Sequence, residues 1–210
     1  MNKLVKKLML VAAMLMLAAG PSFAADAIRI GLMCPLTGKW ASEGQDMQQI
    51  VSLLVSEVNK AGGINGKQIE LVVEDDAGDP RTASLAAQKL ASAGVMAVIG
   101  TYGSAVTEAS QNIIDEAEIM QIATGSTSVR LTEKGLPLFF RTCPRDDEQG
   151  RVASKVIAAK GFKKVAILHD NSAYAKGLAD EAKQRILDKK SADIVFFDAL
   201  VPGERDYSAI

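Results

Sequence analysis

Four short turns in the sequence carry hydroxyl or aromatic side chains, three of them together with glycine, and each follows a run of apolar residues. These turns span residues 35–40, 100–104, 124–128 and 169–174. Hydroxyl groups and free backbone N–H groups at the start of a helix suit a carboxylate, because both donate hydrogen bonds and the helix dipole favours negative charge. We therefore take Ser104 and Thr127 as candidates to bind an anionic group. The alternative is that both residues only cap helices.

Common enzyme and metal motifs are missing from the sequence. No Gly-x-Gly-x-x-Gly follows the first apolar run, and there is no phosphate-binding loop and no Gly-x-Ser-x-Gly elbow. The single histidine, His169, ends an apolar run, which favours a structural hydrogen bond over general-base work. The acids Asp75, Asp76 and Asp79 lack the spacing of a calcium loop and are expected to cap a helix and shape a turn. We therefore expect no enzyme, no metal and no cofactor.

Two cysteines, Cys34 and Cys143, leave two alternatives open. They can form a disulfide if the chain is exported, or remain two separate thiols. Their 109-residue separation does not decide between the two, because a disulfide requires close Cα atoms rather than a given spacing.

The elements that must position these turns alternate along the chain. Short β-rich apolar runs predict strands at residues 28–33, 69–73, 95–99, 119–123, 138–142, 165–168 and 194–197. Amphipathic segments between them predict helices that begin near residues 42, 79, 104, 147 and 174. Strict alternation of this kind is typical of an α/β fold in which helices cover both faces of a parallel sheet.

Local signals place several helix ends. Ser42 and Gln45 have the spacing of a capping box, and Asp79-Pro80 is a cap followed by proline at the first helical position. Gly62 and Gly161 are expected to end helices. The helix that follows Ser42 carries one predicted apolar face, formed by Met47, Ile50, Val51, Leu54 and Val58.

The first 24 residues have the pattern of a secretory signal peptide. Three lysines precede an apolar run at residues 8–19, and Ser22-Phe23-Ala24 offers small residues for cleavage after Ala24. The apolar run has about 12 residues, whereas a membrane anchor must cross roughly 30 Å of hydrocarbon at 1.5 Å per residue. We expect export to a Gram-negative periplasm. Residues 25–210 keep 21 basic and 25 acidic residues, a balance that excludes a basic surface for nucleic acid.

The alternation divides into two series, which we expect to form two lobes at residues 25–143 and 144–210. The boundary has no Gly/Ser linker, which suits a hinge better than a loose tether. The second series predicts only two or three strands, too few for an independent doubly wound sheet. We therefore expect the second lobe to be incomplete and the sequence to be cut from a longer protein.

The chain resembles the periplasmic leucine/isoleucine/valine-binding proteins from residue 28 to its end. The matching segments keep the family's order and spacing, at residues 35–38, 59–66, 75–80, 98–100, 140–142, 165–170, 174, 177–178 and 203–208. The resemblance implies a two-lobed type I periplasmic binding fold that closes on an amino acid. It also implies delivery of that amino acid to the membrane permease of an ATP-driven importer, by a monomer.

The resemblance also implies roles for individual residues. Ser104 matches a serine that binds the ligand carboxylate, and Thr127 matches a threonine that binds both the carboxylate and the ammonium group. Tyr174 matches an aromatic residue that closes over the ligand from the second lobe. Wall and backbone contacts are implied at Tyr102, Gly125 and Ser126.

Three positions depart from the family pattern. Glu43 stands where an aromatic residue is usual, with Trp40 nearby as a substitute in the pocket. Gly78 and Gly103 stand where some members have two disulfide-bonded cysteines. The acid that usually pairs with the ligand ammonium group is expected beyond Ile210. Because the change at Glu43 alters the side-chain pocket, the identity of the bound amino acid stays open. A sensory module on the same fold, a secreted α/β enzyme and a remnant that binds nothing are the alternatives to a transport protein.

Overall fold

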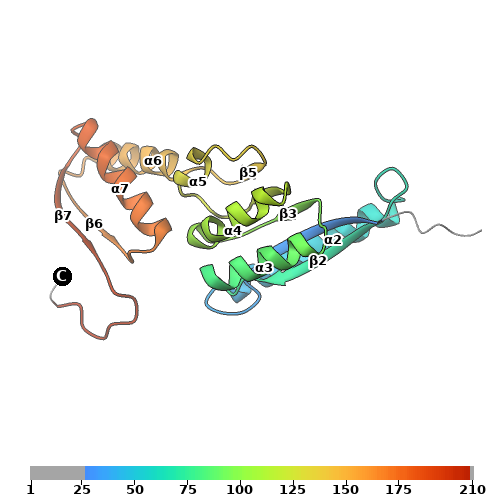
Figure 1. Ribbon diagram of the computed structural model, residues 1–210. Helices are drawn as coiled ribbons and strands as arrows, with labels where there is room; N and C mark the ends of the chain where they lie inside the picture. The colour runs from blue at the N-terminus through green and yellow to red at the C-terminus, as the bar shows by residue number, and fades with distance from the viewer. Residues whose placement is uncertain (1–26, 209–210) are drawn as a thin grey trace, which may run out of the picture.

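The computed structural model describes residues 27–208 (Figure 1). The predicted signal peptide lies outside these residues. Among the described residues, no helix combines the length and apolar character that a membrane crossing requires.

The first part of the chain forms a five-stranded sheet in the order β2-β1-β3-β4-β5, and every neighbouring pair is parallel. The pairing of β1 with β2 is the longest and runs in register from Ile28–Ile69 to Cys34–Asp75. The strands are β1 (Ile28–Cys34), β2 (Ile69–Asp75), β3 (Ala97–Ile99), β4 (Met120–Ala123) and β5 (Phe139–Arg141).

Helical segments connect these strands, as parallel neighbours require a crossover connection. Because the strand order changes direction at β1, α2 lies on one face of the sheet, whereas α3 and α4 pack together on the other. The helices are α2 (Ala41–Lys60), α3 (Pro80–Ser92), α4 (Ser104–Glu116) and the short α5 (Arg130–Glu133). Only α5 was missed by the sequence prediction.

The rest of the chain forms a second, two-stranded parallel sheet of β6 (Lys164–His169) and β7 (Asp193–Ala199). The connection between the strands is α7 (Ala173–Asp188), and α6 (Asp146–Lys160) packs along α7. In Figure 1 this group lies beside the five-stranded sheet, with α6 next to α5 and α7 next to α4. The predicted α/β alternation is confirmed in both sheets.

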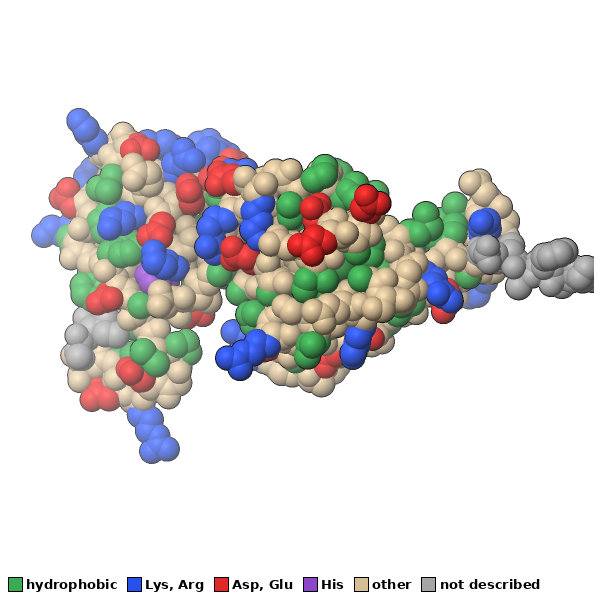
Figure 2. Space-filling model, in the orientation of Figure 1, with side chains coloured by type: hydrophobic (Ala, Val, Ile, Leu, Met, Phe, Trp, Pro, Cys, Tyr) green, Lys and Arg blue, Asp and Glu red, His purple; other side chains and the backbone are tan. Residues whose placement is uncertain are grey.

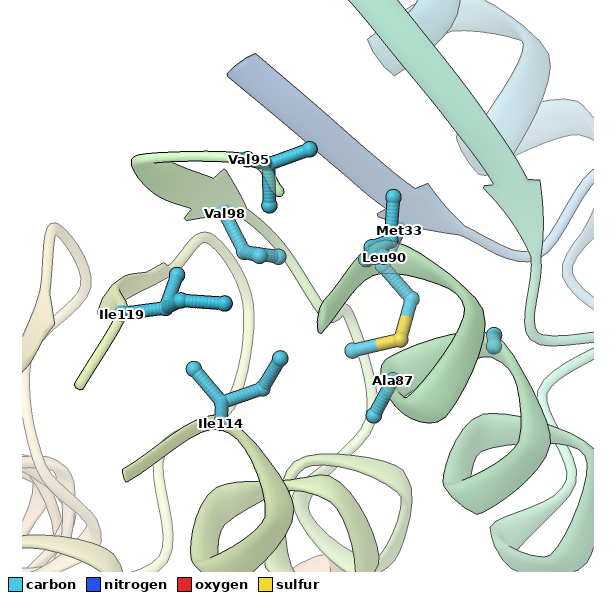
Figure 3. Close-up of a cluster of buried hydrophobic side chains, with 8 residues drawn as sticks. Met33, Ala87, Leu90, Val95, Val98, Ile114 and Ile119 are labelled. Atoms are coloured by element: carbon cyan, nitrogen blue, oxygen red, sulfur yellow. The ribbon is translucent and has the colours of Figure 1, made fainter. Parts of the chain in front are cut away.

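One apolar cluster holds the first sheet against its helices (Figure 3). Met33 of β1 and Val98 of β3 face Leu90 of α3 and Ile114 of α4, and all four side chains are fully or almost fully buried. This cluster fixes α3 and α4 against the strands, and α4 begins at one of the candidate turns.

The helix ends agree with most of the sequence signals. The Asp79 carboxylate accepts the N–H groups of Arg81 and Thr82 at 3.0 and 2.9 Å, and Gly161 ends α6 in the left-handed conformation. The capping box predicted at Ser42 is wrong. Trp40 is the N-cap of α2, while the exposed Ser42 hydroxyl donates to its neighbour Glu43.

The predicted apolar face of α2 is only partly buried. Met47, Val51 and Val58 are half-buried, but 59% of Ile50 and 54% of Leu54 remain exposed. The prediction is wrong for these two residues, because the apolar stripe is wider than the contact of α2 with β1 and β2.

On the face that Figure 2 shows, basic and acidic side chains are intermixed.

Candidate functional site

The turns that follow β1, β3 and β4 meet at one edge of the first sheet, because these strands are parallel neighbours. They surround a cavity of about 150 Å³, and Tyr174 of α7 contributes to it from the side of the second sheet. The lining residues are Trp40, Tyr102, Gly103, Ser104, Gly125, Thr127 and Tyr174. Six of the seven residues proposed from the sequence are thus brought together.

Ser104 is the first residue of α4, and only 3% of it is exposed. Its hydroxyl does not cap α4, since the N-cap is Gly103 and no side chain satisfies that end. Instead, Ser104 Oγ accepts the N–H of Ser128 at 3.2 Å, a contact that ties the start of α4 to the turn after β4. The hydroxyl proton of Ser104 is therefore available at a helix N-terminus, where negative charge is favoured.

Thr127 lies opposite Ser104 in the cavity lining and is 8% exposed. Its hydroxyl is buried and has no hydrogen-bond partner of good geometry. A buried hydroxyl without a partner costs free energy, and native proteins usually satisfy such groups. Thr127 is therefore suited to bind a polar group that enters the cavity.

Ser126 is the one proposed residue that does not line the cavity. Its side chain is fully buried beneath the turn, and its hydroxyl bonds to the hydroxyl of Thr107 at 2.5 Å and to the carbonyl oxygen of Tyr102 at 3.1 Å. Its own carbonyl oxygen accepts from Arg141 at 3.0 Å. Ser126 therefore supports the turn from below.

Trp40 and Tyr102 form one wall of the cavity. Their ring centroids are 5.6 Å apart and their planes meet at 71°, an edge-to-face contact. The ammonium group of Lys39 lies over the Trp40 ring, 4.2 Å from its centroid, which is a cation–π contact.

The carboxylate of Asp75 holds the loop that carries Trp40. It accepts the N–H of Leu36 at 2.8 Å, the hydroxyl of Thr37 at 2.6 Å and the N–H of Ala77 at 2.8 Å. Burial acts to raise the pKa of Asp75, but these donors outweigh it and the pKa is lowered. Asp75 thus clamps the turn after β1 to the turn after β2.

Tyr174 lies in the first turn of α7 and is partly exposed where it meets the cavity. Burial, and then the negative charge of Asp146, raise the pKa of its phenol, so the ring stays neutral and can donate a hydrogen bond. It is the one lining residue that comes from the second sheet's helices.

Asp146 was missed by the sequence analysis. It is 1% exposed, its N–H donates to the carbonyl oxygen of Thr127 at 2.9 Å, and its Oδ1 accepts from Gln149. The Thr127 hydroxyl lies beside its carboxyl group, yet Oδ2 has no partner of good geometry. Burial raises its pKa. In the sequence, an aspartate at a helix start is indistinguishable from an ordinary cap, so no local signal could have found it.

The remaining polar candidates have structural roles. His169 accepts the N–H of Asn171 at 3.0 Å through Nδ1, as predicted. Asp76 accepts the N–H of Gly78 within the turn after β2, and Asp79 caps α3, so the predicted roles of the acidic cluster are confirmed. Cys34 and Cys143 are both free thiols. Within residues 27–208, no three His, Cys, Asp or Glu side chains are grouped to hold a metal.

Comparison with known proteins decides the family. The model described as "Periplasmic binding protein" matches residues 27–210. The chain belongs to the periplasmic binding protein family. The resemblance drawn from the sequence is thereby confirmed at the level of the family.

Two curated relatives are named for binding branched-chain amino acids. A Leu/Ile/Val-binding protein homolog from Brucella abortus is 39% identical over 196 residues, which cover 92% of this chain and 52% of the relative. A leucine-, isoleucine-, valine-, threonine- and alanine-binding protein from Pseudomonas aeruginosa is 38% identical, with coverage of 91% and 52%. The chain thus spans about half the length of these curated relatives.

A solved structure extends the comparison to three dimensions. The branched-chain amino acid substrate-binding protein LivJ from Streptococcus pneumoniae, in complex with isoleucine, superposes with a TM-score of 0.77 at 30% identity. The match covers 88% of this chain and 52% of LivJ. The fold is therefore that of about half of a type I periplasmic binding protein.

Proposed function

We propose that this protein binds a branched-chain or related amino acid in the cavity between its two sheets, as the binding component of an ATP-driven importer. The observation that carries the proposal is the pair of buried hydroxyl groups of Ser104 and Thr127 beside the free N-terminus of α4. The names of the relatives, which bind leucine, isoleucine and valine, support the same ligand class.

In this proposal, Ser104 and the N-terminus of α4 bind the ligand carboxylate, and Thr127 donates a further hydrogen bond. Each charge-assisted bond contributes about 1.5–3 kcal/mol. Asp146, whose Oδ2 is buried without a partner next to Thr127, offers an acceptor for the ammonium group. The apolar side chain of the ligand lies against Trp40 and Tyr102, where burial adds about 1.5–3 kcal/mol.

Closure completes the site. We assign residues 25–143 and 144–210 to two lobes, and Tyr174 covers the ligand from the second lobe when the lobes approach. A ligand held by one lobe alone stays half solvated, so affinity depends on closure. After the costs of association and closure, we expect a binding free energy of about −8 kcal/mol, which corresponds to a dissociation constant near the micromolar range.

The importer role sets the partners. The protein works as a monomer in the periplasm and delivers its amino acid to a membrane permease. The intermixed charges on the face that Figure 2 shows and the formal net charge of -1 agree with a partner other than nucleic acid.

Trp40 supplies a direct test, since it is the single tryptophan of the 210 residues and lines the cavity. Titrating the purified protein with leucine is expected to change the tryptophan fluorescence, with the same midpoint as calorimetry. Leucine, isoleucine, valine and alanine are compared, with glutamate as the charged control. Saturable binding of an apolar amino acid supports the proposal, and binding of none of them by either method refutes it.

A further inference from the structure

Two glycines in the cavity lining have no backbone reason to be glycine. Ten glycines of the described residues have positive φ, where side chains are strained, but Gly103 and Gly125 are not among them. Gly103 has φ −92° and ψ 140°, which any residue adopts, and it is the N-cap of α4. At that position Ser, Asn and Asp stabilise a helix better than glycine does.

The reason for Gly103 is the ring of Trp40. A Cβ atom at Gly103 would lie 2.6 Å from Cζ3 and 3.0 Å from Cη2 of Trp40. Gly78, from the turn after β2, meets the same ring, since its Cβ would lie 2.8 Å from Cε3. The benzo edge of the indole is therefore seated against the backbones of two separate turns.

Gly125 has the same relation to Tyr102. A Cβ atom there would lie 2.6 Å from Cδ2 and 3.0 Å from Cε2 of the tyrosine ring, and 2.9 Å from the backbone carbonyl oxygen of Tyr102. Trp40 and Tyr102 in turn contact each other edge to face. We call Trp40 and Tyr102 the aromatic wall. Both rings line the cavity, and so do Gly103 and Gly125.

We propose that Gly103 and Gly125 are positioning residues, which seat the aromatic wall against the backbone and so limit the size of the ligand side chain that the cavity accepts. The inference rests on the proposed amino acid site and adds the element that sets the size of its side-chain pocket. In a cavity of about 150 Å³, the space released or filled by one ring is a large fraction of the whole. Seating each ring directly on backbone leaves that wall little freedom to retreat.

The test measures the order of affinities rather than affinity alone. Calorimetry of the purified protein with alanine, leucine and phenylalanine is compared for wild type, Trp40→Ala, Gly103→Ala and the double variant. Phe162→Ala, an exposed aromatic truncation in the α6–β6 connection, is the matched control. Loss of folded protein lowers all three affinities together, whereas a change of the wall alters their ratio.

We expect Trp40→Ala to raise the affinity for phenylalanine relative to that for leucine by about tenfold, because the removed indole leaves space for a larger side chain. Gly103→Ala should lower the affinity for leucine relative to that for alanine by about tenfold, since the new methyl group displaces the ring. In the Trp40→Ala background the same methyl group meets no ring, so its effect on the ratio should nearly vanish. Gly103→Ala should also shift the Trp40 emission in the absence of ligand.

Two results would overturn the inference: an unchanged order of affinities in Trp40→Ala, or an equal effect of Gly103→Ala in both backgrounds. If Gly103→Ala does not fold, Trp40→Ala alone decides. A wild-type protein that binds none of the three amino acids would overturn the proposed function, and the inference with it. Normal wild-type binding with an unaltered order would remove the inference only.

Discussion

The backbone N–H of Asp146 donates a 2.9 Å hydrogen bond to the carbonyl oxygen of Thr127. This bond joins the first residue of α6 to the cavity-lining turn after β4. It also brings the Thr127 hydroxyl beside the Asp146 carboxyl group, where the hydroxyl acts to lower the pKa of Asp146 and burial acts to raise it. A hydroxyl beside a carboxylate complements the two charged groups of an amino acid, and this pairing leads to the first prediction.

Asp146→Asn should weaken leucine binding by at least about tenfold, because one charge-assisted bond to the ammonium group is lost. The same variant should bind 4-methylpentanoate, which is leucine without its amino group, as the wild type does. Calorimetry with both ligands measures the difference. Asp147→Asn, whose carboxylate pairs with Arg145 at 2.9 Å, is the neighbouring control. Equal losses for both ligands would mean that Asp146 only positions Thr127.

Ser104→Ala should weaken binding of the same amino acid at least about tenfold, since a donor to the ligand carboxylate is removed at the α4 N-terminus. The N–H of Ser128 also loses its acceptor in this variant. Thermal unfolding without ligand therefore accompanies the calorimetry. Ser42→Ala, an exposed serine that contacts only Glu43, is the control. An unchanged dissociation constant would exclude Ser104 from the site.

Asp76 should make the protein less stable as pH rises. Burial, opposed by the N–H of Gly78, raises its pKa to about 6 in the folded state, above the ordinary value. The folded state therefore holds a proton that the unfolded state has released between about pH 4 and pH 6. The stabilisation from this proton is complete below pH 4 and is lost through pH 6, on the order of 3 kcal/mol.

Asp76→Asn cannot titrate and keeps an oxygen to accept from Gly78. Urea unfolding of both proteins from pH 4 to pH 7 should show the wild type losing stability relative to the variant as pH rises. Parallel curves for the two proteins would contradict the raised pKa.

The two thiols should differ in reactivity. Burial raises the pKa of Cys34 to about 12, and its side chain is fully enclosed, whereas Cys143 is partly exposed. The thiolate is the nucleophile, so iodoacetamide at pH 8 should modify Cys143 first and Cys34 only after unfolding. Peptide mass spectrometry identifies the modified residue, and Cys143→Ser removes the fast reaction. Early labelling of Cys34 would disprove the predicted order.

Local signals were enough to predict most of the fold. Asp79-Pro80 and Gly161 act within one helix turn, so the sequence contains everything that determines those ends. The meeting of the turns after β1, β3 and β4 also follows from the alternation, because parallel strands present the same ends at one edge. Ser104 and Thr127 could thus be placed together before any coordinates.

Features that depend on distant packing could not be predicted. The four residues of α5 are too few for a period, and Ile50 and Leu54 satisfy the apolar pattern of α2 although the sheet beneath does not reach them. Asp146 belongs to the same class, since its importance comes from contact with Thr127, 19 positions earlier. The apolar period of a helix shows which of its side chains could be buried. Whether they are buried depends on the elements that pack against the helix, which the local sequence does not specify.

The contact between Gly103 and the Trp40 ring also restricts the order in which the protein can change by mutation. A side chain at Gly103 meets the indole at 2.6 Å, so it becomes acceptable only after Trp40 has been replaced by a smaller residue. The reverse order passes through a variant whose wall is displaced. A lineage that acquires a new ligand by this route must therefore change position 40 first, and its intermediate should accept a broader range of amino acids than either its ancestor or its descendant.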